Sequence, residues 1–108
     1  MNTIKRSETF RRVLRFRNRL TNTAPDLTGC TARCQMRSEP GGELLATAMC
    51  YVSPDSGSVT AVFSREMTAD LPLGKVGYDI WLIGDGEQKP IYTEEVMIVD
   101  SYTDMTEN

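Results

Sequence analysis

The sequence predicts an all-β fold in which two antiparallel sheets pack face to face. Turn-forming residues (Gly, Pro, Asp, Asn and Ser) cluster at fairly regular intervals along the 108 residues, and the segments between the clusters alternate apolar and polar side chains. Such alternation is typical of strands with one buried face. No long helix is predicted, and the length corresponds to a single domain.

The N-terminal strand is predicted within the segment ETFRRVLRFRNRL. Phe10, Leu14 and Phe16 fit one face of a strand, which Arg12 interrupts. Because Phe10, Val13 and Leu14 also fit one face of a helix, the helix stays open as an alternative.

The sequence TARCQMR predicts a strand over residues 31–37, because its alternate positions from Ala32 to Met36 are apolar. A turn follows at residues 39–42, where Pro fixes φ and two glycines can adopt positive φ. Residues 43–52 (ELLATAMCYV) are apolar at both odd-numbered and even-numbered positions, which predicts one strand covered on both sides. Their Leu and Ala residues would also suit a helix, but Thr, Tyr and Val favour the strand.

A turn at residues 54–57 leads into a strand over Ser58–Phe63 (SVTAVF), where every second residue is apolar on one face. Ser64 can then cap a short helical turn over residues 65–68. That turn must end before Pro72, because Pro disfavours the helical conformation in the residue ahead of it.

The clearest alternation lies in KVGYDIWLI, which predicts a strand over residues 75–83 with Tyr78 on its apolar face. Residues 84–87 form a turn that reverses the chain. Two further short strands are predicted at residues 90–92 and 96–99. About seven short strands without a long helix indicate an antiparallel β-sandwich of the immunoglobulin-like type.

The sandwich is expected to span residues 8–100, between an N-terminal arm over residues 1–7 and a flexible tail over residues 101–108. No apolar run approaches the roughly 18 residues of a membrane span. The opening sequence MNTIKRSETF lacks the apolar centre of a signal peptide. We therefore expect a soluble protein that is made in the cytosol and binds no membrane.

The odd number of cysteines, Cys30, Cys34 and Cys50, excludes a complete disulfide framework. In a strand, Cys30 and Cys34 would lie about 13 Å apart, beyond the roughly 7 Å that a disulfide allows. Their spacing and the absence of His also make a poor zinc site. We expect the cysteines to be small hydrophobic residues of the core.

Catalytic equipment is missing from the sequence. Without any His, the Ser-His-Asp and Cys-His arrangements are excluded within the chain. Glu94 and Glu95 would point to opposite faces of a strand, so they are no carboxylate pair for glycoside hydrolysis. Phosphate-binding glycine motifs are also missing. We expect no enzymatic activity, no cofactor and no metal.

Asp79, Trp81 and Tyr78 could form a sugar-binding platform, because aromatic rings stack on sugar rings and carboxylates accept hydrogen bonds from hydroxyl groups. The competing interpretation places Tyr78 on the apolar face and Trp81 under a loop, an arm or a partner as a buried anchor.

Charge is divided unevenly along the chain. Residues 1–37 contain nine basic and two acidic residues, whereas residues 38–108 contain three basic and thirteen acidic residues. The overall acidity disfavours nucleic-acid binding. Either the arginines pair with an acidic surface, within the fold or on a neighbouring copy, or they are solvated along an edge strand. We expect contact residues at Arg11, Arg12, Arg15, Arg17 and Arg19.

Three stretches carry a resemblance to a known family: Ala24–Gly29 (APDLTG) before a strand, Ser58–Phe63 running into MTADL, and Leu73–Ile80 (LGKVGYDI). They resemble the small immunoglobulin-like modules of tailed bacteriophages, such as the N-terminal domain of baseplate upper proteins and fibre-anchoring domains. The resemblance covers residues 8–100, and its motifs are turns and core positions. Gly77 departs from the pattern, because the family often has a bulkier residue there.

The resemblance implies a non-enzymatic virion protein that assembles with copies of itself and with other virion proteins in the tail, baseplate or fibre attachment. Because the chain stops just after the module, an adaptor or decoration subunit is expected. The motif also implies that Asp26 caps a turn, that Gly29 and Gly74 adopt unusual φ, and that the Tyr78 hydroxyl reaches a backbone group. The alternatives are a capsid decoration or head-fibre module that binds host glycans, and a regulator of one host protein.

Overall fold

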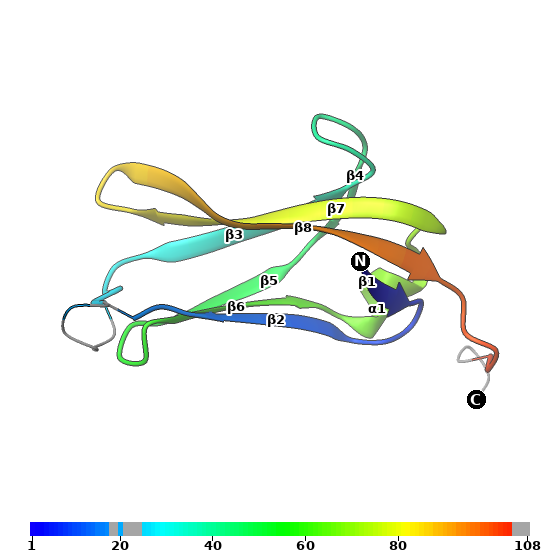
Figure 1. Cartoon of the computed structure of the whole chain (residues 1–108), viewed down its shortest axis with the longest axis horizontal. Coiled ribbons are helices and arrows are strands. Elements are labelled where there is room, and N and C mark those ends of the chain that lie inside the picture. The colour runs from blue at the N-terminus through cyan, green and yellow to red at the C-terminus, as the bar shows by residue number, and fades with distance from the viewer. Residues whose placement is uncertain (18–19, 21–24, 105–108) are drawn as a thin grey trace.

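The computed structural model describes residues 1–17, 20 and 25–104, which fold as a β-sandwich (Figure 1). Within these residues, one sheet has five strands in the order β1-β8-β7-β3-β4, and the other has three in the order β2-β6-β5. The predicted all-β sandwich is therefore confirmed. The elements in chain order are β1 (Asn2–Lys5), β2 (Phe10–Arg15), β3 (Thr31–Arg37), β4 (Leu44–Thr47), β5 (Met49–Ser53), β6 (Ser58–Phe63), α1 (Arg65–Ala69), β7 (Gly74–Gly84) and β8 (Glu87–Val99).

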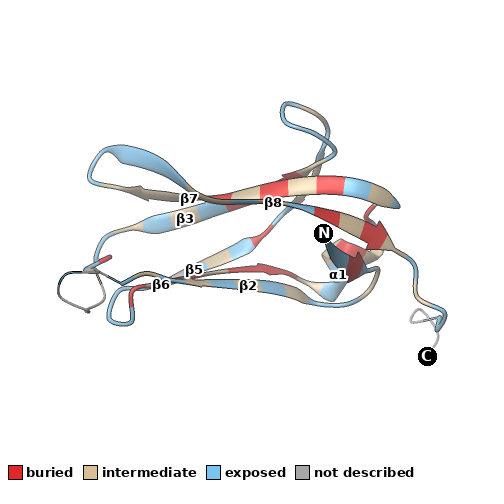
Figure 2. Ribbon diagram, viewed as in Figure 1, coloured by how far each residue is buried: buried red, intermediate tan, exposed pale blue. Residues whose placement is uncertain are grey.

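The core lies between the facing sides of the two sheets, where buried positions gather (Figure 2). In β6 the inward side chains of Val59, Ala61 and Phe63 are at most 1% exposed. In β7, Tyr78 and Ile80 point inward and are similarly buried. The alternation predicted for both strands is confirmed, because the apolar positions of each share the face that water does not reach.

The N-terminal arm expected over residues 1–7 contains strand β1 instead. Asn2–Lys5 pair in parallel with the end of β8, and the side chain of Ile4 is fully buried. The segment has a single inward apolar residue, which is too little alternation to predict a strand. Long-range pairing with β8 makes these residues part of the sandwich.

The single covered strand expected over residues 43–52 is wrong, because the chain changes sheets at Ala48. Among the described strands, β4 pairs with β3 alone and β5 pairs with β6 alone, so both are edge strands. The Ala48 N–H donates to the Cys34 carbonyl at 2.9 Å, which holds the crossing point against β3. Both edge strands expose apolar side chains, and Tyr51 is 58% exposed.

Strands β7 and β8 form a long antiparallel hairpin. The turn residues Asp85 and Gly86 both have positive φ, 51° and 73°, as a two-residue type I′ turn requires. The two short strands expected at residues 90–92 and 96–99 are parts of the one strand β8. The residues between them, 93–95 (TEE), are all polar and gave no apolar alternation to join the two segments. Within β8, Ile91 is an extra residue opposite the step from Ile80 to Trp81.

The remaining local predictions concern β2 and α1. Strand β2 forms where strand and helix were both open, so the strand interpretation is confirmed. The Ser64 hydroxyl accepts a hydrogen bond from the Met67 N–H at 3.3 Å and caps α1, as predicted. This short helix carries the chain from the three-stranded sheet to β7 in the five-stranded sheet.

Candidate functional site

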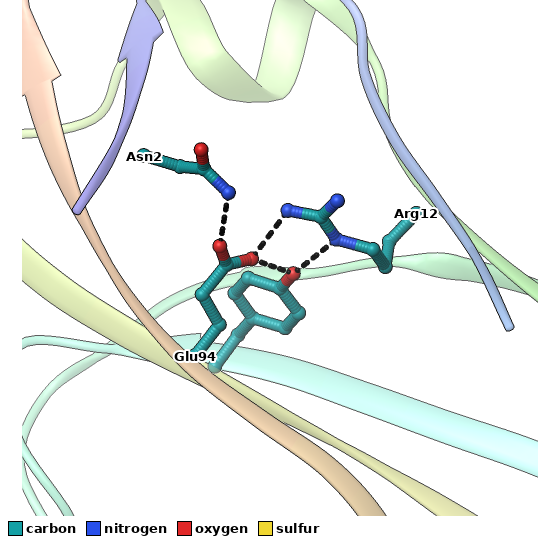
Figure 3. Close-up of polar contacts among 4 residues, drawn as sticks. Asn2, Arg12 and Glu94 are labelled. Carbon is teal, nitrogen blue, oxygen red and sulfur yellow. Dashed lines mark hydrogen bonds and ion pairs between the residues drawn. The ribbon is translucent and has the colours of Figure 1, made fainter.

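A polar cluster of Asn2, Arg12, Tyr78 and Glu94 lies between the sheets, and we call it the Arg12 cluster (Figure 3). Arg12 Nε donates to the Tyr78 hydroxyl at 3.1 Å, and an Arg12 Nη donates to a Glu94 carboxylate oxygen at 2.6 Å. The Tyr78 hydroxyl donates to the same Glu94 oxygen at 2.5 Å, and the Asn2 amide donates to the other one. The members come from β1, β2, β7 and β8, so the cluster ties the two sheets together.

The cluster is ionised at neutral pH. Burial opposes ionisation of Glu94, but the hydrogen bonds from Tyr78, Arg12 and Asn2 outweigh burial and hold the pKa of Glu94 below its usual value of 4.5. The hydrogen bond to Tyr78 is the main cause that raises the pKa of Arg12. Burial raises the pKa of the Tyr78 hydroxyl. The site therefore holds a guanidinium, a carboxylate and a neutral phenol, which is a stable ion pair with an added donor.

Arg12 is turned inward, although its neighbours on β2 point outward. Its guanidinium carbon lies 5.3 Å from the ring centroid of Phe10 and 5.6 Å from that of Tyr92. Its side chain is 26% exposed. Arg12 was expected to contact a partner surface, but its guanidinium already binds Tyr78 and Glu94 inside the sandwich. The signal was visible in the sequence, because Arg12 interrupts an apolar face.

Arg11 and Arg15 project from the opposite face of β2, where both are exposed. Neither has an ion-pair partner within the described part of the chain. Arg17, just beyond the strand, is exposed as well. Arg19, the remaining expected contact residue, lies outside the described residues.

The outer face of the three-stranded sheet combines these arginines with apolar side chains. The register places Val13, Thr60 and Tyr51 in one row across β2, β6 and β5, with Arg11 and Met49 at the two ends of the next row. Val13 is 37%, Met49 44% and Tyr51 58% exposed. This face is chemically suited to contact with another protein surface, because apolar and aromatic groups lie beside cations without partners in the described chain. The exposure of β5 was missed, because the sequence gives no sign of the sheet change at Ala48.

Trp81 lies on the outer face of the five-stranded sheet, on the far side of the sandwich from Arg11 and Arg15. It is half-buried and lines a shallow hollow of about 250 Å³ together with Arg33, Gln35, Asp79 and Gln88. Tyr78 lies on the buried face, as the competing interpretation placed it, so the alternative of a sugar-binding platform with Asp79 and Trp81 loses one member. The expected site residues are therefore not brought together on one surface.

A wider groove of about 640 Å³ adjoins the hollow at Gln35 and Asp79 and passes over Gly77. The turn at residues 38–41 forms one wall, and Lys75 and Glu95 line the floor beside Gly77. A Cβ atom at Gly77 would meet ordinary contacts only, the nearest at 3.6 Å from the Glu94 carbonyl oxygen. The small residue thus leaves room on this face that a larger one would fill.

The cysteines and carboxylates form no further cluster in the parts of the chain that the structure describes. No group of three metal-ligating residues occurs there. Cys34 is buried in the core, and burial raises the pKa of its thiol and of the Cys50 thiol. Glu94 points inward and Glu95 points outward, as expected for neighbours in a strand. The Glu95 carboxylate lies 3.6 Å from the Lys75 ammonium group.

Comparison with models of known protein families gives no match to the sequence, and comparison with curated proteins gives none either. No helix in the described residues has both the length and the apolar character that are needed to cross a bilayer.

Proposed function

We propose that this chain is a non-enzymatic structural protein of a tailed bacteriophage particle, built as an immunoglobulin-like sandwich that assembles with other virion proteins and with its own copies. The observation that carries the proposal is the strand order. If β2 to β8 are lettered B, C, C′, D, E, F and G, the sheets read B-E-D and C′-C-F-G. This order matches the strand order of immunoglobulin-like domains, with β1 added beside G, and it supports the proposed fold type.

The resemblance to phage modules gains support from the geometry of its motifs. The Asp26 carboxylate accepts a hydrogen bond from the Thr28 N–H at 2.9 Å, and Leu27 between them is 6% exposed. Gly29 and Gly74 have φ of 81° and 113°, conformations that favour glycine. One expectation changes, since the Tyr78 hydroxyl binds Arg12 and Glu94 side chains and not a backbone group.

The outer arginines of β2 supply the contact that this role needs. Arg11 and Arg15 are exposed and without ion-pair partners in the described chain, and they share the outer face with apolar side chains such as Val13. An acidic patch on a neighbouring virion protein would pair with them and direct its orientation. Residues 38–108 of another copy, which contain thirteen acidic residues, offer the same chemistry.

Charge reversal tests the role in particle assembly. A phage whose copy of this chain carries Arg11→Glu and Arg15→Glu should assemble particles that lack the chain, because repulsion replaces attraction at the contact. Mass spectrometry of purified particles measures incorporation. The matched control is Arg65→Glu with Lys89→Glu, which changes the net charge equally at exposed positions elsewhere. Normal incorporation of the Arg11/Arg15 variant, or absence of the unaltered chain from particles, contradicts the proposal.

A second candidate function, binding of a host glycan, is favoured by the hollow at Trp81. One aromatic ring and the polar groups of Asp79, Arg33 and Gln88 surround a space of about 250 Å³. A glycan array should then give a signal that Trp81→Ala abolishes. Tyr102→Ala, which removes a fully exposed aromatic ring elsewhere, is the matched control. A purified chain that gives no signal on any array removes this candidate.

A further inference from the structure

Strand β5 presents an edge whose backbone groups are open to another strand. The Phe16 N–H donates to the Gly57 carbonyl at 2.9 Å, which makes these opposite residues a hydrogen-bonded pair. Hydrogen-bonded and non-bonded pairs alternate along an antiparallel ladder. Following the register across β6, the pairs from Tyr51 to Thr60 and from Met49 to Val62 are hydrogen-bonded. The N–H and C=O groups of Cys50 and Val52 therefore point away from β6.

This open edge has defined ends. On the same side of the strand, the Ala48 N–H is taken by the Cys34 carbonyl. At the other end, Pro54 has no N–H to donate. In the described chain, Cys50 and Val52 have no other backbone partner on that side. The edge can therefore pair with only a short segment, centred on Tyr51.

Charge protects β2 from strand pairing but leaves β5 unprotected. β2 (FRRVLR) carries outward arginines at Arg11 and Arg15, which would lie close together if two copies of β2 paired. Residues 44–53 (LLATAMCYVS) contain no charged residue and no Pro. Edge strands in soluble proteins are usually protected by charge, Pro, a bulge or a covering segment. Within the described residues, β5 has none of these.

We propose that two copies of this chain pair through β5 in an antiparallel arrangement about a twofold axis, so that two three-stranded sheets become one continuous sheet. Tyr51 lies on the axis, and Cys50 of each copy is opposite Val52 of the other. Because these are the residues with outward backbone groups, each opposite pair exchanges both hydrogen bonds. The two Tyr51 residues then form a non-hydrogen-bonded pair with Cα atoms about 4.5 Å apart, where aromatic side chains stabilise a sheet.

The observations favour a second copy over a strand from another protein. Pairing about Tyr51 uses the open groups of both edges completely, without leaving an unpaired donor within the contact. It also places the exposed Tyr51 and Met49 of each copy on one surface, so that each covers part of the other. An isologous contact of this kind closes as a dimer. The dimer extends the proposed assembly role, but it does not depend on the phage assignment.

The experiment measures the mass of the purified full chain by sedimentation equilibrium over a range of concentrations. The unaltered chain should form a dimer. Tyr51→Lys should raise the dimer dissociation constant by about tenfold or more, because like charges directly opposite each other destabilise a strand pair. Val13→Lys is the matched control, since Val13 lies in the same row on the other side of Thr60. This variant should dimerise like the unaltered chain.

Cross-linking gives an independent readout of the register. Tyr51→Cys should form a disulfide-linked dimer under mild oxidation, in excess of the unaltered chain and of Val13→Cys, because the twofold axis brings the two introduced thiols together. A chain that stays monomeric at all concentrations overturns the proposal. A dimer that Val13→Lys disrupts and Tyr51→Lys does not would also overturn it. The same holds for an open polymer whose contacts need both β2 and β5. Particle incorporation is measured separately, so a failed dimer leaves the proposed function standing.

Discussion

The two edge strands of the three-stranded sheet both pair with β6, but they are tied to the five-stranded sheet by different means. β2 is tied by a side chain, because Arg12 crosses the interior and binds Tyr78 and Glu94 of the other sheet. β5 is tied by its backbone, through the bond from Ala48 to Cys34 at its first end. The outward faces differ too, with arginines on β2 and uncharged side chains on β5. The outward arginines of β2 oppose pairing with another strand. The uncharged edge of β5 lacks this protection.

The largest effect on stability is expected from removing the side-chain tie of β2. Arg12→Leu should lower the free energy of unfolding by about 2 kcal/mol, since it leaves the Glu94 carboxylate half-buried without its cation. The figure is reduced from that of a fully buried pair, because water reaches part of the cluster. Urea denaturation measures the change. Arg11→Leu, one residue away on the outer face, is the control and should change stability by less than about 0.5 kcal/mol. Equal losses in both variants would mean that the two faces of β2 do not differ.

Removal of the backbone tie of β5 should have a smaller effect. Ala48→Pro removes the N–H that donates to Cys34 and leaves that carbonyl without its partner, which should cost about 1–2 kcal/mol. Ala48→Gly keeps the N–H and serves as the control for the lost methyl group. Hydrogen exchange at β5 should increase in the Pro variant more than in the Gly variant. Unchanged exchange would show that the strand crossing does not depend on this bond.

The side-chain tie also predicts how stability changes with pH. Because the pKa of Glu94 is lowered in the folded state, its contribution is full above the usual value of 4.5 and is lost as the pH falls from there through the lower folded value. Glu94→Gln should therefore be less stable than the unaltered chain at pH 7, and the difference should shrink as the solution is acidified toward pH 3. Thermal unfolding at several pH values measures it. A difference that stays constant below 4.5 would exclude the ion pair as its cause.

The sequence predicts β3, β6 and β7 well, but it misses β1, the sheet change at Ala48 and the continuity of β8. β3, β6 and β7 alternate because each buries one face under the opposite sheet. β1 has one inward residue, Ile4, and its position depends on pairing with the far end of the chain. The break at Ala48 has no local signal, because a small apolar residue fits either one continuous strand or a crossing. Arg12 was recognised as irregular, but its partners Tyr78 and Glu94 are distant in sequence and only the fold brings them together.

The smallest expected effect separates the two edge strands by the concentration dependence of stability. Val13→Thr and Tyr51→Thr each replace an exposed side chain beside Thr60 by the same β-branched residue. At concentrations where the chain is monomeric, both variants should change the free energy of unfolding by less than about 0.5 kcal/mol, because neither side chain is buried. At higher concentrations only Tyr51→Thr should lose stability relative to the unaltered chain, since partner binding stabilises the folded state by mass action. Concentration-dependent thermal unfolding separates the two cases, and a matching concentration dependence in both variants would mean that the two edges are equivalent.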